Sequence, residues 1–193
     1  MKKLKILVPL AIVVAFLVNL AIAQEEYEFM PKGGSMLLLE VLDSSPTCDD
    51  IVSIVTAKRT QEEWEAYFTN QESALKDLTE EQVKTLVAYL AINMPIPKEE
   101  IPKETEKIDW VTFLPFDGWL LTLETCMNCH GLDAALIEER ELVGWATLFG
   151  SHDHVILPLT EQQWETLEYY LAINMPIPEE DIPEEMWGAP PSY

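Results

Sequence analysis

The chain has 193 residues, a formal net charge of −22 and a sequence pI near 4.2. A chain of this length forms one large domain or two small ones. Its negative charge repels nucleic acid and anionic membrane surfaces, so we expect neither as a partner. A protein partner with a basic docking surface is the expected alternative.

The first 23 residues have the pattern of a secretory signal peptide. Residues 6–22 are almost wholly apolar and are preceded by Lys2, Lys3 and Lys5; an A-x-A cleavage site, Ala21-Ile22-Ala23, follows. We therefore expect export to the periplasm or the extracellular space, and no stable membrane span once the signal is cleaved. The alternative is an uncleaved N-terminal anchor, because the apolar run approaches the ~20 residues that a span needs.

The rest of the chain contains an internal repeat. Residues 48–102 align with residues 129–183 without a gap, and residues 29–40 resemble residues 113–124 with an offset three residues larger. We therefore expect two tandem modules and an irregular tail, at residues 24–104, 105–187 and 188–193. Residues 98–107, which are rich in charge and proline, are the expected linker.

Both repeats predict helices, so the expected fold class is all-α. Each repeat opens with an apolar helical stretch, at residues 37–42 and 119–123. Farther on, Thr79 with Gln82 and Thr160 with Gln163 have the spacing of a capping box, and apolar residues follow at helical intervals. A Met-Pro-Ile-Pro sequence must then end each helix, because proline cannot continue it. Nothing predicts a convincing pair of strands.

The second repeat contains Cys126-Met127-Asn128-Cys129-His130. This C-x-x-C-H pattern is the attachment signature of c-type haem. Each of the two thiols can add to one haem vinyl group, and the histidine can bind the iron as its proximal ligand. We expect one covalently attached haem c at Cys126, Cys129 and His130. The alternatives are two free thiols, or a zinc site formed by both cysteines with His152 and His154, whose H-x-H spacing is tighter than usual.

The first repeat lacks this motif. Ser45 and Asp49 stand where the motif has its first cysteine and its histidine. We therefore expect the first module to be haem-less. Cys48, which aligns with the second cysteine of the motif, is then a leftover thiol; we expect it to be buried, with an intermolecular disulfide as the alternative.

The second repeat resembles the class I cytochrome c family, and in particular the haem domain of quinohaemoprotein amine dehydrogenase. The resemblance rests on the haem motif near the first helix, on Trp145, and on the pattern L-T-x-x-Q-x-x-x-L-x-x-Y-L-A at residues 159–172. It covers residues 113–178 and, in degenerate form, residues 29–97. It implies that the last helix packs across the first, next to the haem. It also implies a distal iron ligand, usually methionine, about seven residues after the tryptophan, where this chain has His152.

The internal comparison helps to choose the distal ligand. His152 and His154 are replaced by glutamine and serine in the first repeat, so both occur only beside the haem motif. We expect bis-histidine coordination by His130 and His152, with His154 as the substitute. Met175 is a rival, but its counterpart Met94 persists where no iron is expected. An open or water-bound iron is the remaining alternative.

Arg140 and Trp145 are natural partners for the haem propionates, because guanidinium pairs well with carboxylates. Their counterparts Arg59 and Trp64 persist in the haem-less repeat, so we expect a structural role for these residues.

The expected function is electron transfer by a mono-haem cytochrome rather than catalysis. The protein would act as a carrier, or as a subunit of a larger redox complex or oligomer. The alternatives are a structural or assembly subunit that docks through its haem-less module, and a gas-binding haem protein with an open iron site.

Overall fold

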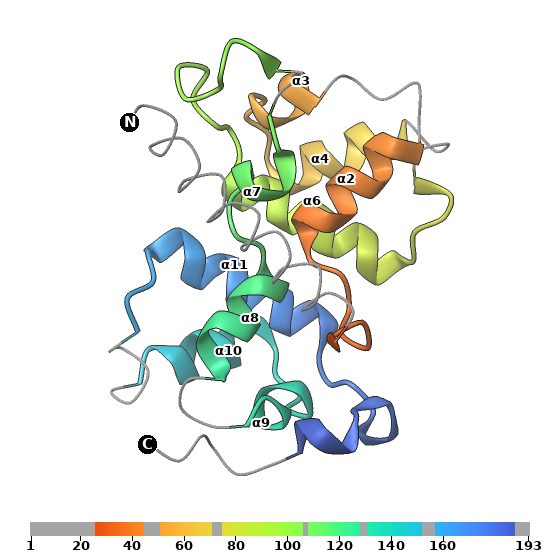
Figure 1. The fold of residues 1–193 in the computed structure, drawn as a ribbon, viewed down its shortest axis with the longest axis vertical. Coiled ribbons are helices and arrows are strands. Elements are labelled where there is room, and N and C mark those ends of the chain that lie inside the picture. Colours follow the sequence, from red (N-terminus) through yellow and green to blue (C-terminus); the bar gives the residue numbers. More distant parts are fainter. Residues whose placement is uncertain are drawn as a thin grey trace, which may run out of the picture. The chain divides into compact units, whose positions relative to one another are not determined.

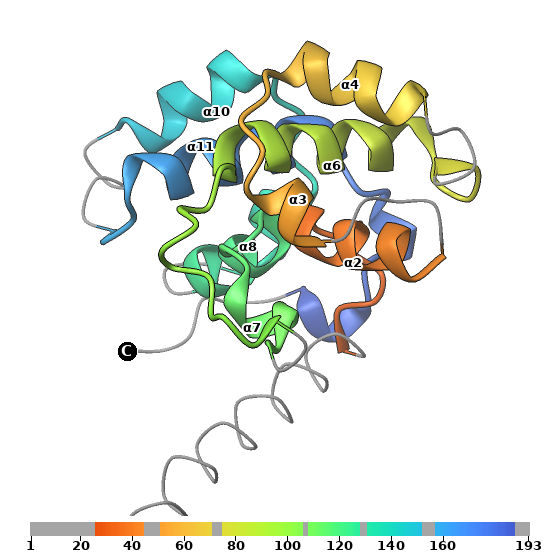
Figure 2. The ribbon, with the colours of Figure 1, turned by 90° about the horizontal axis from the view of Figure 1, so that it is seen from above.

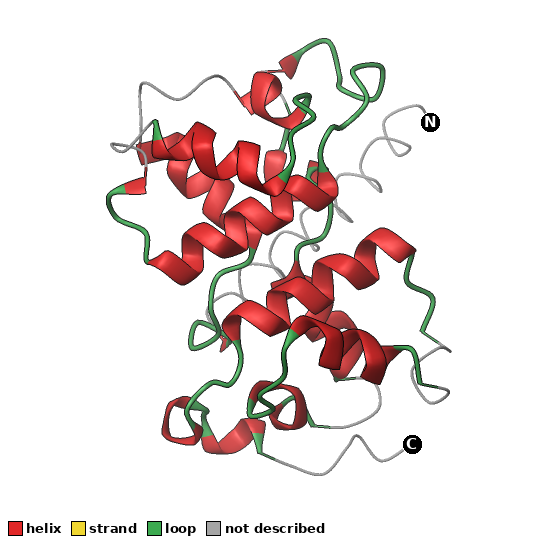
Figure 3. Cartoon of the chain, turned by 180° about the vertical axis from the view of Figure 1, so that it is seen from behind, coloured by secondary structure: helices red, strands yellow, loops and turns green. Residues whose placement is uncertain are grey.

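The structure is a computed structural model that describes residues 26–44, 51–70, 75–105, 108–127, 131–151 and 157–187. Residues Pro31–Tyr193 form one compact unit and Met1–Met30 form another. Every regular element in the described ranges is a helix, which confirms the all-α fold class (Figure 3). None of the described helices is long and apolar enough to cross a membrane. The expected signal segment and the expected tail lie outside the described residues.

The helices from Pro31 onward follow the same order in two halves (Figure 1), which we call the first half (residues 31–104) and the second half (residues 105–187). The first half contains α2 (Gly34–Ser44), α3 (Ile51–Val55), α4 (Gln61–Thr69) and α6 (Glu80–Asn93). The short α7 (Trp110–Phe113), which the sequence did not predict, comes next. The second half continues with α8 (Gly118–Cys126), α9 (Asp133–Leu136), α10 (Leu142–Phe149), α11 (Glu161–Asn174), and the 3-10 turns η2 (Glu179–Asp181) and η3 (Glu184–Met186).

Local sequence signals define both ends of α6 and α11. At the start of α6, the backbone N–H of Thr79 donates to Gln82 Oε1 at 2.9 Å, and the backbone N–H of Gln82 donates to Thr79 Oγ1 at 3.2 Å. Thr160 and Gln163 form the same capping box at the start of α11. Both helices end at the asparagine that precedes Met-Pro-Ile-Pro. The predicted capping boxes and helix ends are therefore confirmed.

Two long helices form the middle layer of the unit (Figure 2). Helix α6 packs against α11, and each of them lies between two shorter helices of its own half: α2 and α4 for α6, α8 and α10 for α11. The buried side of α2 shows why it packs there, because Leu37, Leu38 and Val41 recur at helical spacing and are at most 1% exposed. The core also contains one fully buried tryptophan from each half, Trp64 and Trp145.

A glycine allows the first and last helices of each half to cross closely. A Cβ atom added to Gly34 would lie closer than 3.0 Å to Tyr89 on α6, and one added to Gly118 would lie equally close to Tyr170 on α11. Any larger residue at these positions would force the helices apart. The resemblance described above implies this packing of the first helix against the last.

The two halves meet through reciprocal hydrogen bonds. Tyr89 Oη donates to the carbonyl oxygen of Pro115 at 2.9 Å, while Tyr170 Oη donates to the carbonyl oxygen of Pro31 at 2.6 Å. Two asparagine–threonine pairs repeat the pattern: Asn93 Nδ2 to Thr166 Oγ1 at 3.0 Å, and Asn174 Nδ2 to Thr85 Oγ1 at 2.9 Å. Equivalent residues thus exchange equivalent contacts, as in the two-fold interface of a symmetric dimer.

Candidate functional site

Cys126 is the motif residue whose thiol the structure places. It is the last residue of α8, its side chain is 7% exposed, and its Sγ lies 3.9 Å from Thr125 Oγ1. Met127 follows as the C-cap and is 38% exposed. Exposure therefore increases from the first to the second residue of the motif. The other expected site residues, which are Cys129, His130, His152 and His154, lie outside the described ranges. Cys48 lies outside them as well.

The helix register refines the comparison between the halves at Cys126. Counted from the equivalent glycines Gly34 and Gly118, position 126 corresponds to Leu42 in α2. The ungapped alignment of the later residues assigns Ser45 to it instead. Neither residue is a thiol, so the first half lacks this attachment point in both registers.

Two buried donors in the second half have no acceptor in the described part of the chain. They are Trp145 Nε1 and Arg140 Nε. Trp145 is 2% exposed and stacks on Phe149 with ring centroids 5.7 Å apart, while Arg140 uses a different nitrogen, Nη2, to pair with Glu138 at 2.7 Å. Leaving a buried donor without an acceptor costs about 1–3 kcal/mol of folding stability. An acceptor from outside the described residues would remove that cost for both nitrogens. Haem propionates are such acceptors, and the residues present therefore fit the expected cofactor.

Asp133 is a candidate that the sequence analysis missed. It is the first residue of α9, and its Oδ1 is buried without a hydrogen-bond partner among the described residues. It follows the motif histidine His130 by three positions. The available signal was a carboxylate immediately after a haem motif, where a ligating histidine needs an acceptor for its second ring N–H.

Met175 has the same surroundings as its first-half counterpart. Met175 is 7% exposed and Met94 is 6% exposed, and each caps the C-terminal end of its long helix. Two residues later, the backbone N–H groups of Ile177 and Ile96 donate at 2.7 Å to equivalent carbonyl groups, those of Leu136 and Val55. Packing and helix termination account for both methionines without any iron.

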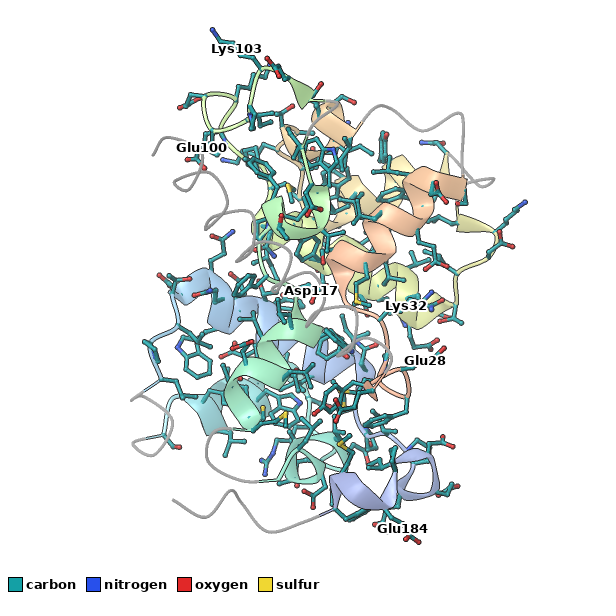
Figure 4. All side chains as sticks on the ribbon, viewed as in Figure 1. Glu28, Lys32, Glu100, Lys103, Asp117 and Glu184 are labelled. Atoms are coloured by element: carbon teal, nitrogen blue, oxygen red, sulfur yellow. The ribbon has the colours of Figure 1, made fainter. Side chains whose placement is uncertain are left out.

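A buried carboxylate lies where the two halves meet: Asp117, labelled in Figure 4 beside α8. Its Oδ1 accepts from the backbone N–H of Leu120 at 3.1 Å and so caps α8. Its Oδ2 accepts from Ser35 at the start of α2, through the backbone N–H at 3.1 Å and through Oγ at 2.6 Å. One side chain therefore caps a helix of each half.

The surroundings of Asp117 perturb several ionisable groups. Burial raises the pKa of Asp117, although its hydrogen bonds from Ser35 and Leu120 act in the opposite direction. Burial also raises the pKa of Tyr89 and of Tyr170, and the negative charge of Asp117 adds to both shifts. The equivalent position in the first half is Gly33, and a Cβ there would collide with the Asp117 carboxylate. The available sequence signal was an Asp-Gly pair at a helix start where the first repeat has Gly-Gly.

Comparisons with known proteins assign no function to these residues. No protein-family model, curated protein or solved structure matches this chain. Within the described ranges no three or more potential metal ligands gather, and all three histidines fall outside those ranges. The functional interpretation therefore rests on the C-x-x-C-H motif and on the buried groups near it.

Proposed function

We propose that this chain is an exported mono-haem c-type cytochrome that acts in electron transfer. The observation that carries the proposal is the Cys126-Met127-Asn128-Cys129-His130 motif. Two features of the second half support it. Its first cysteine lies buried at the end of α8, which packs on α11, and two buried donors nearby in sequence, on Arg140 and Trp145, lack an acceptor in the described part of the chain.

Each site residue then has a defined role. Cys126 and Cys129 would hold the haem covalently, and His130 together with His152 or His154 would bind its iron. The bound haem supplies reversible one-electron transfer at its iron. Arg140 and Trp145 would donate hydrogen bonds to the haem propionates and so stabilise those charges inside the protein. Asp133 would accept a hydrogen bond from the second ring N–H of His130 and so orient the imidazole.

Exposed apolar side chains gather in the half that carries the motif. Met127, Ile137 and Val143 are 38%, 37% and 70% exposed. In the first half, the equivalents of Ile137 and Val143 are the polar residues Thr56 and Glu62. Exposed apolar side chains in the half that carries the motif, on a strongly acidic protein, suit transient docking of a basic redox partner, with a rate that falls as salt increases.

The reciprocal interface favours a supporting role for the first half. Its α6 is paired with α11, and its Asn93 and Tyr89 donate to acceptors of the second half. That face is therefore already used inside the chain. We infer that the haem-less half completes the fold of the haem-bearing half, and that assembly into a larger complex would use another face.

The haem assignment is tested by mass. The chain is exported from cells that carry out covalent haem attachment, and the intact mass of the purified protein is measured. We expect the mass of one haem per chain, reduced haem attachment in Cys126→Ala and in Cys129→Ala, and full attachment in the matched control Cys48→Ala. A wild-type mass with no haem or with two haems, or loss of haem in the Cys48 variant, would contradict the proposal.

The distal ligand is tested by spectroscopy of the oxidised protein. We expect no methionine-to-iron band in the near infrared, and a change toward high-spin haem in His152→Ala or in His154→Ala. Met175→Leu should leave the spectrum unchanged, as should the matched control Met94→Leu. A spectrum altered by Met175→Leu alone would identify methionine ligation, and a high-spin wild-type protein would identify the open site of a gas-binding haem.

A further inference from the structure

The first half retains a pair of buried donors although it lacks the haem motif. Trp64 is fully buried, and neither its Nε1 nor Arg59 Nη1 has a hydrogen-bond partner among the described residues. These two residues are equivalent to Trp145 and Arg140. Leaving such donors without an acceptor costs about 1–3 kcal/mol each, so a chain that keeps both of them implies that they bind something.

The charge around Arg59 differs from the charge around Arg140. Arg140 forms an ion pair with Glu138 and is preceded by Glu139, so residues 138–140 carry a net charge of −1. The equivalent first-half residues are Ala57, Lys58 and Arg59, and they carry a net charge of +2. The first half therefore has no carboxylate at the position of Glu138, the residue that pairs with Arg140, and Arg59 is preceded by a lysine instead of a glutamate.

Aromatic rings hold the Arg59 guanidinium in place. Its Cζ lies 4.5 Å from the ring centroid of Trp64 and 4.3 Å from that of Tyr67. In the second half, the equivalent of Tyr67 is a leucine, and Arg140 Cζ lies farther from its tryptophan ring, at 5.9 Å. Stacking fixes the plane of a guanidinium but satisfies none of its N–H groups. The group is therefore preorganised to receive an acceptor.

We propose that the first half contains its own anion site, in which Arg59 and Trp64 bind one carboxylate group of a ligand that is not covalently attached. A planar carboxylate offers two acceptor oxygens to one guanidinium N–H and one indole N–H. A buried site with so few donors favours this monoanion over phosphate, because each additional buried charge would lack a partner. The carboxylate belongs either to a small organic acid or to a tetrapyrrole. The inference goes beyond electron transfer, because the residues proposed to bind the haem all belong to the second half.

The first experiment follows the indole proton of Trp64 by NMR in the reduced, full-length holoprotein. Trp64→Phe assigns the signal, and the protein is titrated with acetate and with propionate, using chloride at equal ionic strength as the control anion. We expect a saturable shift with the carboxylates and none with chloride. Arg59→Gln should weaken binding about 10-fold or more, since a charge-assisted hydrogen bond is lost. The matched second-half variant Arg140→Gln should leave the Trp64 response unchanged.

The second experiment identifies the source of the carboxylate. Acidified organic solvent extracts non-covalent tetrapyrrole from the purified protein and leaves covalent haem in place. If one tetrapyrrole per chain is extracted from wild type and none from Arg59→Gln, the proposal is supported and the ligand is a tetrapyrrole. If no tetrapyrrole is extracted but the NMR titration is saturable, the proposal is supported and the ligand is a small organic acid. The proposal is overturned if the Trp64 indole signal shifts with neither carboxylate and no tetrapyrrole is extracted. Asp49 and Asp50 are the nearest acidic residues before Arg59 in the sequence and so are possible internal acceptors. A carboxylate-induced shift that appears only in Asp49→Asn or Asp50→Asn also overturns the proposal, because the acceptor in the wild-type protein then belongs to the chain.

Discussion

The two halves share their framework and differ in their chemistry. Gly34 and Gly118 lie at equivalent helix crossings, and Asn93 and Asn174 make equivalent hydrogen bonds to the opposite half. The haem motif and all three histidines, in contrast, belong to the second half alone. The difference shows that the contacts that build this fold do not depend on the residues expected to bind the cofactor. The two halves therefore pack against each other through residues that lie outside the C-x-x-C-H motif.

One asymmetry inside the shared framework is the pair of Gly33 and Asp117. These equivalent positions lie so close together that a Cβ on Gly33 would overlap the Asp117 carboxylate. Two carboxylates there would repel each other in a buried place, and two glycines would leave Ser35 and the start of α8 without a cap. One aspartate facing one glycine avoids both problems.

Alanine at either crossing glycine should have the largest effect on stability. Gly34→Ala and Gly118→Ala each place a methyl group against the Cβ of a tyrosine on the facing helix, which cannot move without its backbone. We expect each variant to lower the free energy of unfolding by about 3 kcal/mol, measured by urea denaturation. The control is Gly144→Ala in α10, where the nearest atom, Arg140 Cβ, is 3.3 Å away; it should stay within about 1 kcal/mol of wild type. A large loss at only one of the two crossings would break the equivalence of the halves.

Removal of the shared cap should come next. Asp117→Ala leaves three donors without their acceptor, the two of Ser35 and the backbone N–H of Leu120. We expect a loss of about 2–3 kcal/mol, since a helix cap is worth about 1 kcal/mol and buried unsatisfied donors add to it. Gly33→Ala should cost a similar amount, because it displaces the same carboxylate. Clearly additive losses in the double variant would show that the two positions do not act through one contact.

Local signals in the sequence were enough to predict the two long helices and the first helix of each half. The capping boxes at Thr79 and Thr160 and the proline stops after Met94 and Met175 each depend on neighbouring residues, so both ends of the long helices could be found without a structure. The repeat likewise indicated which helices would be equivalent. The candidate site was recognisable only through the fixed spacing of its C-x-x-C-H motif.

Contacts between the halves could not be predicted in the same way. Asp117 caps α2 by accepting hydrogen bonds from Ser35, which lies 82 residues earlier in the chain, and no local pattern reveals that partner. The buried nitrogens of Trp145 and Arg140 that lack a partner among the described residues could not be predicted either, because a missing acceptor becomes evident only in a structure. The sequence comparison predicted a structural role for these two residues in preference to contacts with the haem propionates.

The reciprocal asparagine–threonine pairs should have smaller and matched effects. Asn93 donates to Thr166 and Asn174 donates to Thr85, over 3.0 and 2.9 Å. Double-mutant cycles with alanine at the asparagine and valine at the threonine should give a coupling of about 0.5–1.5 kcal/mol for each pair. We expect the two couplings to agree within experimental error. Coupling in only one pair would show that the interface is reciprocal in geometry but not in energy.

The smallest expected effect is a pH dependence that originates at Asp117. Burial raises the pKa of this carboxyl above its ordinary value of 3.8, against the opposing hydrogen bonds from Ser35 and Leu120. The folded protein then holds the Asp117 proton more tightly than the unfolded chain does. The stabilisation that results is fully present below the unfolded-state pKa and is lost as the pH rises through the folded-state pKa.

Asp117→Asn isolates this contribution, because asparagine keeps the shape of the protonated carboxyl and cannot ionise. The neighbouring Tyr89 and Tyr170 stay protonated throughout the acid range, since the pKa of each is raised. We expect the unfolding free energy of wild type minus that of the variant to decrease from about pH 3.5 toward neutrality and then to level off. Urea denaturation at a series of pH values measures this difference directly. A difference that increases with pH would mean that the caps on Ser35 and Leu120 outweigh burial, and that the first half stabilises the charged rather than the neutral form of Asp117.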